Sequence, residues 1–301
     1  MDEHDGLAAR FETQRGQLRA VAYRMLGSVA EADDAVQEAW LRLSRADVSG
    51  VGNLAAWLRT VVSRVCLDHL RSRRSRWEDP VGEVPDRSWD DARGSDPELE
   101  AVLVDSVGRA LLVVLDSLVP AERVAFVLHD LFAVPFEDIA AVLERSPVAT
   151  KKLASRARHK VRGTVAVPAA ELARHRHVVD AFLDASRGGD LDALLDVLAP
   201  DVVRRADRAA LPPEVATVVR GARVVAEETL VFGRKARFAQ AALVNGAVGV
   251  VVAPHGRLLT VLTLTVEGDR ITGYEVIADP ARLRRLDLAV LGEPEAATAN
   301  G

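Results

Sequence analysis

The chain has 301 residues, of which 49% are apolar and 28% charged, so it can form two or three domains with hydrophobic cores and is not disordered throughout. Its one cysteine, Cys66, excludes a disulfide scaffold and a multi-cysteine zinc site, and its net charge of −5 is modest. No signal-peptide pattern opens the sequence and no apolar stretch is long enough to span a bilayer, so we expect a soluble protein of the cytoplasm.

Charge is unevenly distributed along the chain. Residues 77–105 hold ten acidic and only two basic residues, with proline and glycine scattered among them. The segments on either side, residues 1–76 and 106–163, hold more basic than acidic residues. We therefore expect an acidic linker between two mildly basic domains. A solubilising spacer is favoured over a segment that folds onto the basic surfaces and competes with a polyanion.

The first basic domain opens with helical periodicity. Residues 31–44 carry an apolar stripe, and the opposite face carries Asp34, Gln37, Glu38 and Leu41 at positions 0, 3, 4 and 7. A face that mixes acids, an amide and a leucine suits a protein partner better than DNA. From spacing alone, an ordinary solvated face is favoured.

A second helix is predicted to begin at Asn53, a good N-cap residue, and to run to Arg76. Four of its last six residues are arginines. They can contact phosphates or unpaired DNA, or they can be a solvated helix end that the helix dipole favours.

The second basic domain predicts a helix-turn-helix. Residues 121–131 and 136–143 each show one apolar stripe, a tight turn follows at Glu144-Arg145, and Ser146-Pro147 opens a third, basic helix. In such an arrangement the N-terminal part of the second helix of the motif enters the major groove. DNA contact is favoured over a plain three-helix bundle, because the turn spacing and the basic face coincide. The residues expected to face base edges and phosphates are Thr150, Lys151, Lys152 and Arg156.

Two stretches of the chain resemble sigma-70 family transcription initiation factors. AEADDAVQEAWLRL (residues 30–43) and NLAAWLRTVVSRVCLDHLRSRRSR (residues 53–76) resemble region 2, and LVPAERVAFVLHDLFAVPFEDIAAVLERSPVATKKLASRARHKVR (residues 118–162) resembles region 4. No room exists between them for region 3, so the pattern resembles the extracytoplasmic-function class. The predicted domains are region 2 over 1–76, an acidic linker over 77–105, region 4 over 106–163 and a short linker over 164–170.

The resemblance implies that the protein binds core RNA polymerase, through the β′ clamp helices and the β flap, and promoter DNA at the −10 and −35 elements. The surface for the clamp helices would be formed by Asp33, Asp34, Gln37, Glu38 and Leu41. The residues implied at the −10 element are Arg64, His69, Arg71, Arg73 and Arg74. The residues implied at the −35 element are Thr150, Lys151, Lys152, Ser155 and Arg156.

A further domain is expected over residues 171–291, followed by a tail over 292–301. Helices are predicted over 171–186 and 191–198, and strands over 238–244, 248–252, 258–266 and 271–277. Helices followed by an antiparallel meander make an α+β domain. The run RHVVDAFLDASRGGDLDALLDVLAPDVV (residues 176–203) resembles the opening of SnoaL-like domains, which fold a curved sheet around a central pocket that can hold a small ligand. The predicted fold is thus multi-domain, with two all-α sigma domains and a C-terminal α+β SnoaL-like cone.

Some extracytoplasmic-function sigma factors carry such a domain and use it for regulation in cis. Two of their motifs are echoed here, at Asp207 and at 279–283, and the resemblance implies a regulatory interface there. Its residues would be Asp207, Asp279, Pro280, Arg282 and Leu283.

Catalysis by the C-terminal domain is not favoured. Asp207, His255 and Tyr274 are the candidates for acid–base chemistry, but no His/Asp pair has a diagnostic spacing. We expect no catalytic residue, no cofactor and no metal. The alternative function is a DNA-binding ligand sensor, or a SnoaL-like enzyme, fused to a sigma-like DNA-binding half. A regulator that works without polymerase would not need the face at Asp34.

Overall fold

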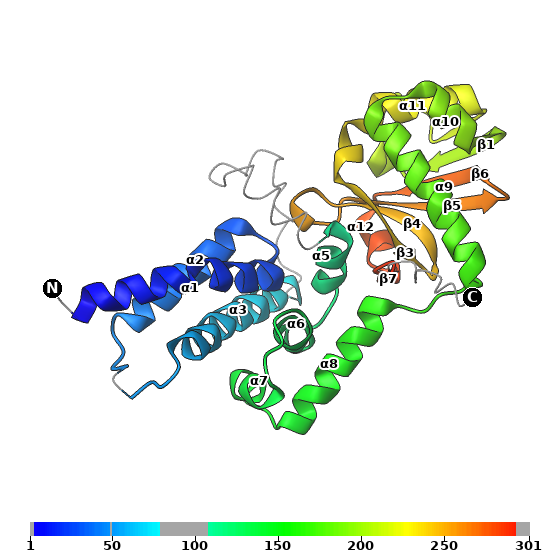
Figure 1. The fold of residues 1–301 in the computed structure, drawn as a ribbon. Coiled ribbons are helices and arrows are strands. Elements are labelled where there is room, and N and C mark those ends of the chain that lie inside the picture. The colour runs from blue at the N-terminus through cyan, green and yellow to red at the C-terminus, as the bar shows by residue number, and fades with distance from the viewer. Residues whose placement is uncertain (1–2, 49, 79–107, 293–301) are drawn as a thin grey trace, which may run out of the picture. The chain divides into compact units, whose positions relative to one another are not determined.

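The computed structural model describes residues 3–48, 50–78 and 108–292 (Figure 1). The predicted acidic linker over 77–105 lies outside the described residues except for its first two, which continue the preceding helix. The chain divides into two compact units. The first comprises Met1–Gly108 and Leu115–His159, and the second comprises Arg109–Val114 and Lys160–Gly301.

Three long helices begin the first unit: α1 (Glu3–Leu26), α2 (Val29–Leu43) and α3 (Leu54–Glu78). The predicted N-cap at Asn53 is confirmed, because its side-chain Oδ1 accepts a hydrogen bond from the backbone N–H of Ala56 at 3.0 Å. The three helices pack around a shared apolar core, in which burial raises the pKa of the Cys66 thiol to about 12. A thiol in that environment is inert. Core residues from the three helices include Val21, Met25, Ala32, Val36, Leu58 and Val62.

The second group of helices forms the predicted helix-turn-helix. It comprises α6 (Pro120–Phe126), a π-helical turn over Val127–Leu131, α7 (Phe136–Leu143) and α8 (Pro147–Arg162). The second half of the single helix expected over 121–131 is thus π-helical, not α-helical. The helix α5 (Arg109–Asp116) was not predicted. In the turn of the motif, Glu144 adopts a left-handed conformation with φ 54°. Ser146 caps α8 by accepting a hydrogen bond from Ala149 N at 3.2 Å.

In the second unit a seven-stranded sheet is combined with helices (Figure 1). The strand order is β2-β1-β6-β5-β4-β3-β7, with β1 parallel to β6 and the other neighbours antiparallel. The predicted meander β3-β4-β5-β6 is confirmed, whereas β1, β2, β7, α11 and α12 were not predicted. The strands are β1 (Leu198–Ala206), β2 (Val218–Arg220), β3 (Ala239–Val244), β4 (Ala247–Val252), β5 (Thr260–Glu267), β6 (Arg270–Ile277) and β7 (Leu288–Ala289). The helices are α9 (Ala169–Gly188), α10 (Leu191–Val197), α11 (Ala222–Phe232) and α12 (Pro280–Leu283).

Both faces of the central strands are covered by apolar side chains. Along β4, Val250 and Val252 belong to a core formed with α9, α10 and α11, whereas Val251 belongs to a second core on the opposite face. Because side chains alternate along a strand, a strand covered on both sides needs apolar residues at every position. This double burial explains the continuous apolar run around residue 250.

The helical segment that contains the helix-turn-helix begins and ends in the second unit, which includes residues 109–114 and the residues from Lys160 onward. At its start, Ala110 N donates to Gln240 Oε1 at 2.9 Å, and a Cβ on Gly256 would lie 2.9 Å from Leu112 Cδ1. At its end, Val290 N donates to Val161 O at 2.8 Å. The sheet domain therefore folds together with residues from the first and last turns of that segment.

Candidate nucleic-acid interface

The outer face of α2 combines acidic and amide groups with an apolar side chain. Asp34 and Gln37 are exposed, and Leu41 is 39% exposed. Asp33 accepts a hydrogen bond from Arg19 at 2.8 Å, and Glu38 accepts one from Arg42 at 3.0 Å. A water-facing leucine among carboxylates is unsuited to DNA, whose backbone is negatively charged, and suits a protein surface with apolar and basic groups.

The arginines predicted at the −10 element occupy different environments on α3. Arg64 donates from Nη2 to the backbone carbonyl of Ala141 at 2.9 Å, and Arg73 donates from Nη2 to Leu26 O at 2.9 Å. His69 and Arg71 are exposed, so they are available to a nucleic acid. The side chain of Arg74 lies outside the described residues. Arg73 thus has a structural role in this arrangement, because it caps the carbonyl of Leu26, the last residue of α1.

Arg123, on α6, is a buried arginine that sequence reasoning missed. Its side chain is only 2% exposed, and its Nη1 donates to Asp116 Oδ1 at 3.0 Å. Its Nε lies 3.4 Å from the carbonyl oxygen of Arg24, near the C-terminus of α1. Burial lowers the pKa of the Arg123 guanidinium and the charge of Asp116 opposes this shift, while arginine remains protonated in any case. The available signal was its position four residues before Val127, on the side of the predicted helix that carries the apolar stripe.

Helix α8 presents a basic face in its first half. Lys151, Lys152 and Ser155 are exposed, as predicted for residues that contact DNA. Thr150 is fully buried, and its hydroxyl donates to Ser146 O at 3.1 Å. The prediction that Thr150 faces base edges is therefore wrong: its side chain completes the first turn of the helix.

Two further arginines of α8 form ion pairs with the preceding helices. Arg156 Nε donates to Glu122 Oε1 at 3.0 Å, and Arg158 pairs with Asp130. Glu122 is buried while the Arg156 side chain remains 60% exposed. Arg156 therefore fixes α8 against α6 and still presents part of its guanidinium to the surface.

In the sheet domain, Asp207 and α12 lie close together, and their role as a regulatory interface stays a prediction. One carboxylate oxygen of Asp207 accepts hydrogen bonds from Ala278 N at 3.1 Å and Asp279 N at 3.0 Å. The other pairs with Arg282, which also donates to Glu275 at 2.9 Å. Burial alone would raise the pKa of Asp207, but the hydrogen bonds from Asp279, Arg282 and Ala278 outweigh it and hold that pKa below its usual range.

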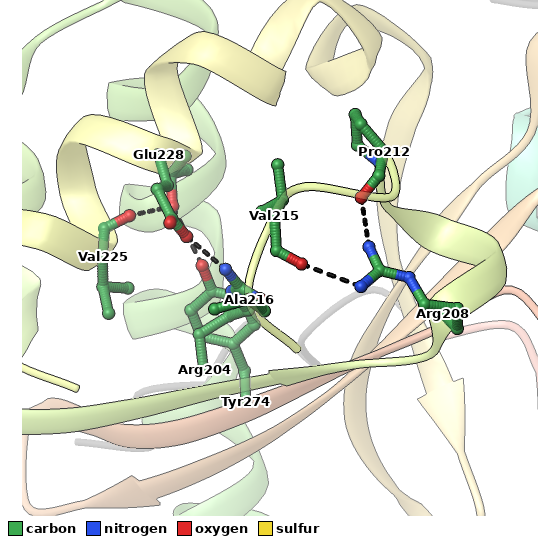
Figure 2. A network of polar contacts seen from close by, with 9 residues as sticks. Arg204, Arg208, Pro212, Val215, Ala216, Val225, Glu228 and Tyr274 are labelled. Carbon is green, nitrogen blue, oxygen red and sulfur yellow. Dashed lines mark hydrogen bonds and ion pairs between the residues drawn. The ribbon is translucent and has the colours of Figure 1, made fainter. Parts of the chain in front are cut away.

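A second polar network lies between β1, β6 and α11 (Figure 2). Arg204 pairs with Glu228 and donates to Ala216 O at 2.8 Å, and its side chain is only 4% exposed. Tyr274 and Thr229 share a hydrogen bond of 2.9 Å between their hydroxyls, and burial raises the pKa of Tyr274. These residues were not predicted to interact, because only the fold brings them together.

Arginine side chains also hold the segment 211–217, which precedes β2 within the sheet domain. Arg208 donates to the carbonyls of Val215, at 2.9 Å, and Pro212, as Figure 2 shows. Arg204 binds a third carbonyl of this segment, that of Ala216, so guanidinium groups hold three of its backbone carbonyls. Two of the candidates for acid–base chemistry, Asp207 and Tyr274, thus form hydrogen bonds in separate networks. The side chain of the third candidate, His255, lies outside the part of the chain whose side chains are described.

In the described part of the chain, none of the helices combines the length and the apolar character that a membrane span requires. The same part of the chain contains no group of three or more histidine, cysteine or acidic side chains arranged to hold a metal ion.

Comparisons with known proteins agree with this description. Residues 11–76 match the model of sigma-70 region 2, and residues 108–161 match a model of sigma-70 region 4. A probable ECF RNA polymerase sigma factor of Mycobacterium tuberculosis, SigI, is 37% identical over 288 residues, which cover 94% of this chain and 97% of that protein. The ECF sigma factor SigJ of the same species is 40% identical over 254 residues, which cover 81% of this chain and 80% of SigJ.

A crystal structure of M. tuberculosis SigJ matches 92% of this chain and 98% of that chain, with 35% sequence identity and a TM-score of 0.45. The predicted fold class of two helical sigma regions and a C-terminal α+β domain is confirmed, and the SnoaL-like type of that domain stays a prediction. The alignment with SigI extends over nearly the whole of both chains. The chain therefore belongs to the family of ECF RNA polymerase sigma factors.

Proposed function

We propose that this protein binds core RNA polymerase and directs promoter-specific transcription initiation, with its C-terminal domain regulating it in cis. One observation carries the proposal: a single chain presents an exposed basic face on a helix-turn-helix and an exposed acidic-apolar face on α2. A DNA-binding regulator needs only the first surface, whereas an initiation factor needs both. It acts in the cytoplasm, where the polymerase is.

The two surfaces bind different partners. Asp34, Gln37 and Leu41 bind the β′ clamp helices, with Asp33 and Glu38 at the edge of this face, and region 4 binds the β flap. At the −35 element, Lys151, Lys152 and Ser155 contact DNA directly, and Arg156 contributes the exposed part of its guanidinium. At the −10 element, His69, Arg71 and Arg74 contribute, and Arg64 does so once it leaves the carbonyl of Ala141.

Regulation in cis is supported by the residues that the sheet domain binds. The second unit contains Ala110 and Val161, which lie at the two ends of the sequence matched to region 4. The network of Asp207 and Arg282 orders α12, which we propose as the regulatory interface together with Asp279, Pro280 and Leu283. A small ligand in the sheet domain remains a proposal. This function includes no catalytic step by the chain itself.

Binding of purified full-length protein to core polymerase tests the first part of the proposal. The variant Asp34→Arg/Glu38→Arg reverses two charges on α2, and we expect it to lose binding. The control is Asp192→Arg/Asp196→Arg, an exposed acidic pair with the same spacing on α10, which is expected to bind as the wild type does. Wild-type binding by the α2 variant would contradict the assigned surface.

Truncation after Pro168 tests regulation, because it removes the sheet domain except for residues 109–114 and 160–168. We expect transcription from a cognate promoter to change, in either direction. Unchanged transcription would argue against regulation in cis. If neither the full-length nor the truncated protein bound polymerase, the second candidate, a DNA-binding ligand sensor, would take first place.

A further inference from the structure

Val148 is an apolar side chain exposed on the recognition helix. It is 68% exposed, although valine is among the residues most often buried. A single exposed valine needs no explanation on an ordinary surface. Val148, however, lies in the first turn of α8, the part of a helix-turn-helix that enters the major groove.

Val148 shares one exposed face of α8 with polar side chains. Lys151, Lys152 and Ser155 follow it by three, four and seven positions, so the four side chains lie on one side of α8. All four are exposed, whereas Thr150 is buried between them in sequence. The exposed face therefore has one apolar group at its N-terminal end, followed by two cations and a hydroxyl.

The position of Val148 is well fixed before any DNA binds. The hydroxyl oxygen of Ser146 caps the helix and Pro147 occupies its first position, which together order the turn. A β-branched side chain in a helix has one strongly preferred rotamer, so little conformational entropy is lost when it is placed against a base.

Only one base offers an apolar partner in the major groove. Thymine carries its C5-methyl group there, while the other edges present hydrogen-bond donors and acceptors. A valine against those polar edges would leave them without water or a partner, which disfavours the other bases. We propose that Val148 reads the methyl group of a thymine in the −35 element, beside the positions contacted by Lys151 and Lys152. The inference rests on the proposed function and adds a specificity-determining residue to it.

The experiment uses the full-length protein with core polymerase and a duplex library randomised over the −35 region. Each thymine of the selected sequence is then replaced by deoxyuridine, which lacks only the methyl group. For the wild type, we expect one replacement to weaken binding about fourfold, the effect of removing one buried methyl group. The variant Val148→Ala is expected to bind the thymine and deoxyuridine duplexes equally.

A matched control is Val231→Ala, which removes a valine that is 69% exposed on α11 of the sheet domain. It should keep the fourfold difference between thymine and deoxyuridine. Selection of a sequence in which no thymine responds to replacement, or an unchanged response in Val148→Ala, would overturn this inference and leave the proposed function intact. Failure of the polymerase–protein complex to select any sequence would overturn both.

Discussion

Asp207 and Arg282 form an ion pair across 75 positions of sequence, and the pair joins the end of β1 to α12. The same aspartate accepts hydrogen bonds from the backbone of Ala278 and Asp279, so one carboxylate fixes the start of the helix. Asp279 in turn caps α12 by accepting a hydrogen bond from Arg282 N at 2.9 Å. The segment proposed as the regulatory interface therefore depends on the charge of one group.

This dependence predicts a loss of stability in acid. Because the pKa of Asp207 is lowered in the folded state, its charged interactions contribute fully above its unfolded pKa of about 3.9 and are lost as pH falls through the folded value. We expect Asp207→Asn to cost about 1–2 kcal/mol near neutral pH, and the difference from the wild type to shrink below about pH 4. Thermal unfolding as a function of pH measures it. A difference that persists unchanged in strong acid would contradict the assignment.

The buried guanidinium of Arg123 predicts a large effect in the first unit. Arg123→Met keeps most of the volume but removes the donors to Asp116 and to the carbonyl of Arg24, so we expect a loss of about 1–3 kcal/mol. Urea unfolding followed by circular dichroism is the measurement. Arg145→Met, at an exposed position in the turn before α8, is the control and should change stability little. Equal stability of the two variants would show that Arg123 is not a structural residue.

Arg64 predicts a separation between folding and promoter opening. Its bond to the Ala141 carbonyl is exposed, so Arg64→Ala should cost less than about 1 kcal/mol of stability. If the same guanidinium contacts the −10 element, the variant should lower open-complex formation several-fold. Permanganate footprinting of the melted region measures this, with exposed Arg45→Ala as the control. Normal opening by Arg64→Ala would remove Arg64 from the −10 residues.

Glu144 predicts a stabilising substitution. It has a left-handed backbone with φ 54° at the C-terminus of α7, a position that favours glycine. Glu144→Gly should therefore raise stability by up to about 1 kcal/mol, whereas Glu144→Ala, which keeps the Cβ, should not. The melting temperatures of the two variants, each compared with that of the wild type, test this prediction. A lower melting temperature for the glycine variant would show that the side chain of Glu144 contributes more than its backbone strain costs.

Local signals in the sequence predicted the parts of this fold that short-range rules govern. Asn53 and Ser146 begin their helices because a side-chain oxygen can satisfy a free backbone N–H three residues later. The meander was predictable from apolar runs separated by turn residues. The strand β1 was missed, since its pairing with β6 is parallel and joins positions about 70 residues apart, which no local pattern encodes.

The site residues show the same limit. Exposure of Lys151 and Lys152 follows from helical periodicity, but Thr150 lies on the edge of the apolar stripe, where one position decides between burial and exposure. Arg73 and Arg123 were charged residues in helical runs, and their roles as caps of α1 depend on tertiary contacts. Periodicity predicts which face a residue occupies and says nothing about which carbonyl it meets.

The shared folding of residues 109–114 and 160–163 with the sheet domain limits how this protein can be recombined. A chimera joined in the short segment 164–170 would place foreign equivalents of Gln240 and Val290 against native Ala110 and Val161, respectively. The backbone at Gly163 also lies very close to Ala289, because a Cβ at position 163 would lie 2.4 Å from the Cβ of Ala289. The exchangeable module is thus discontinuous in sequence, and its two pieces have to be inherited together.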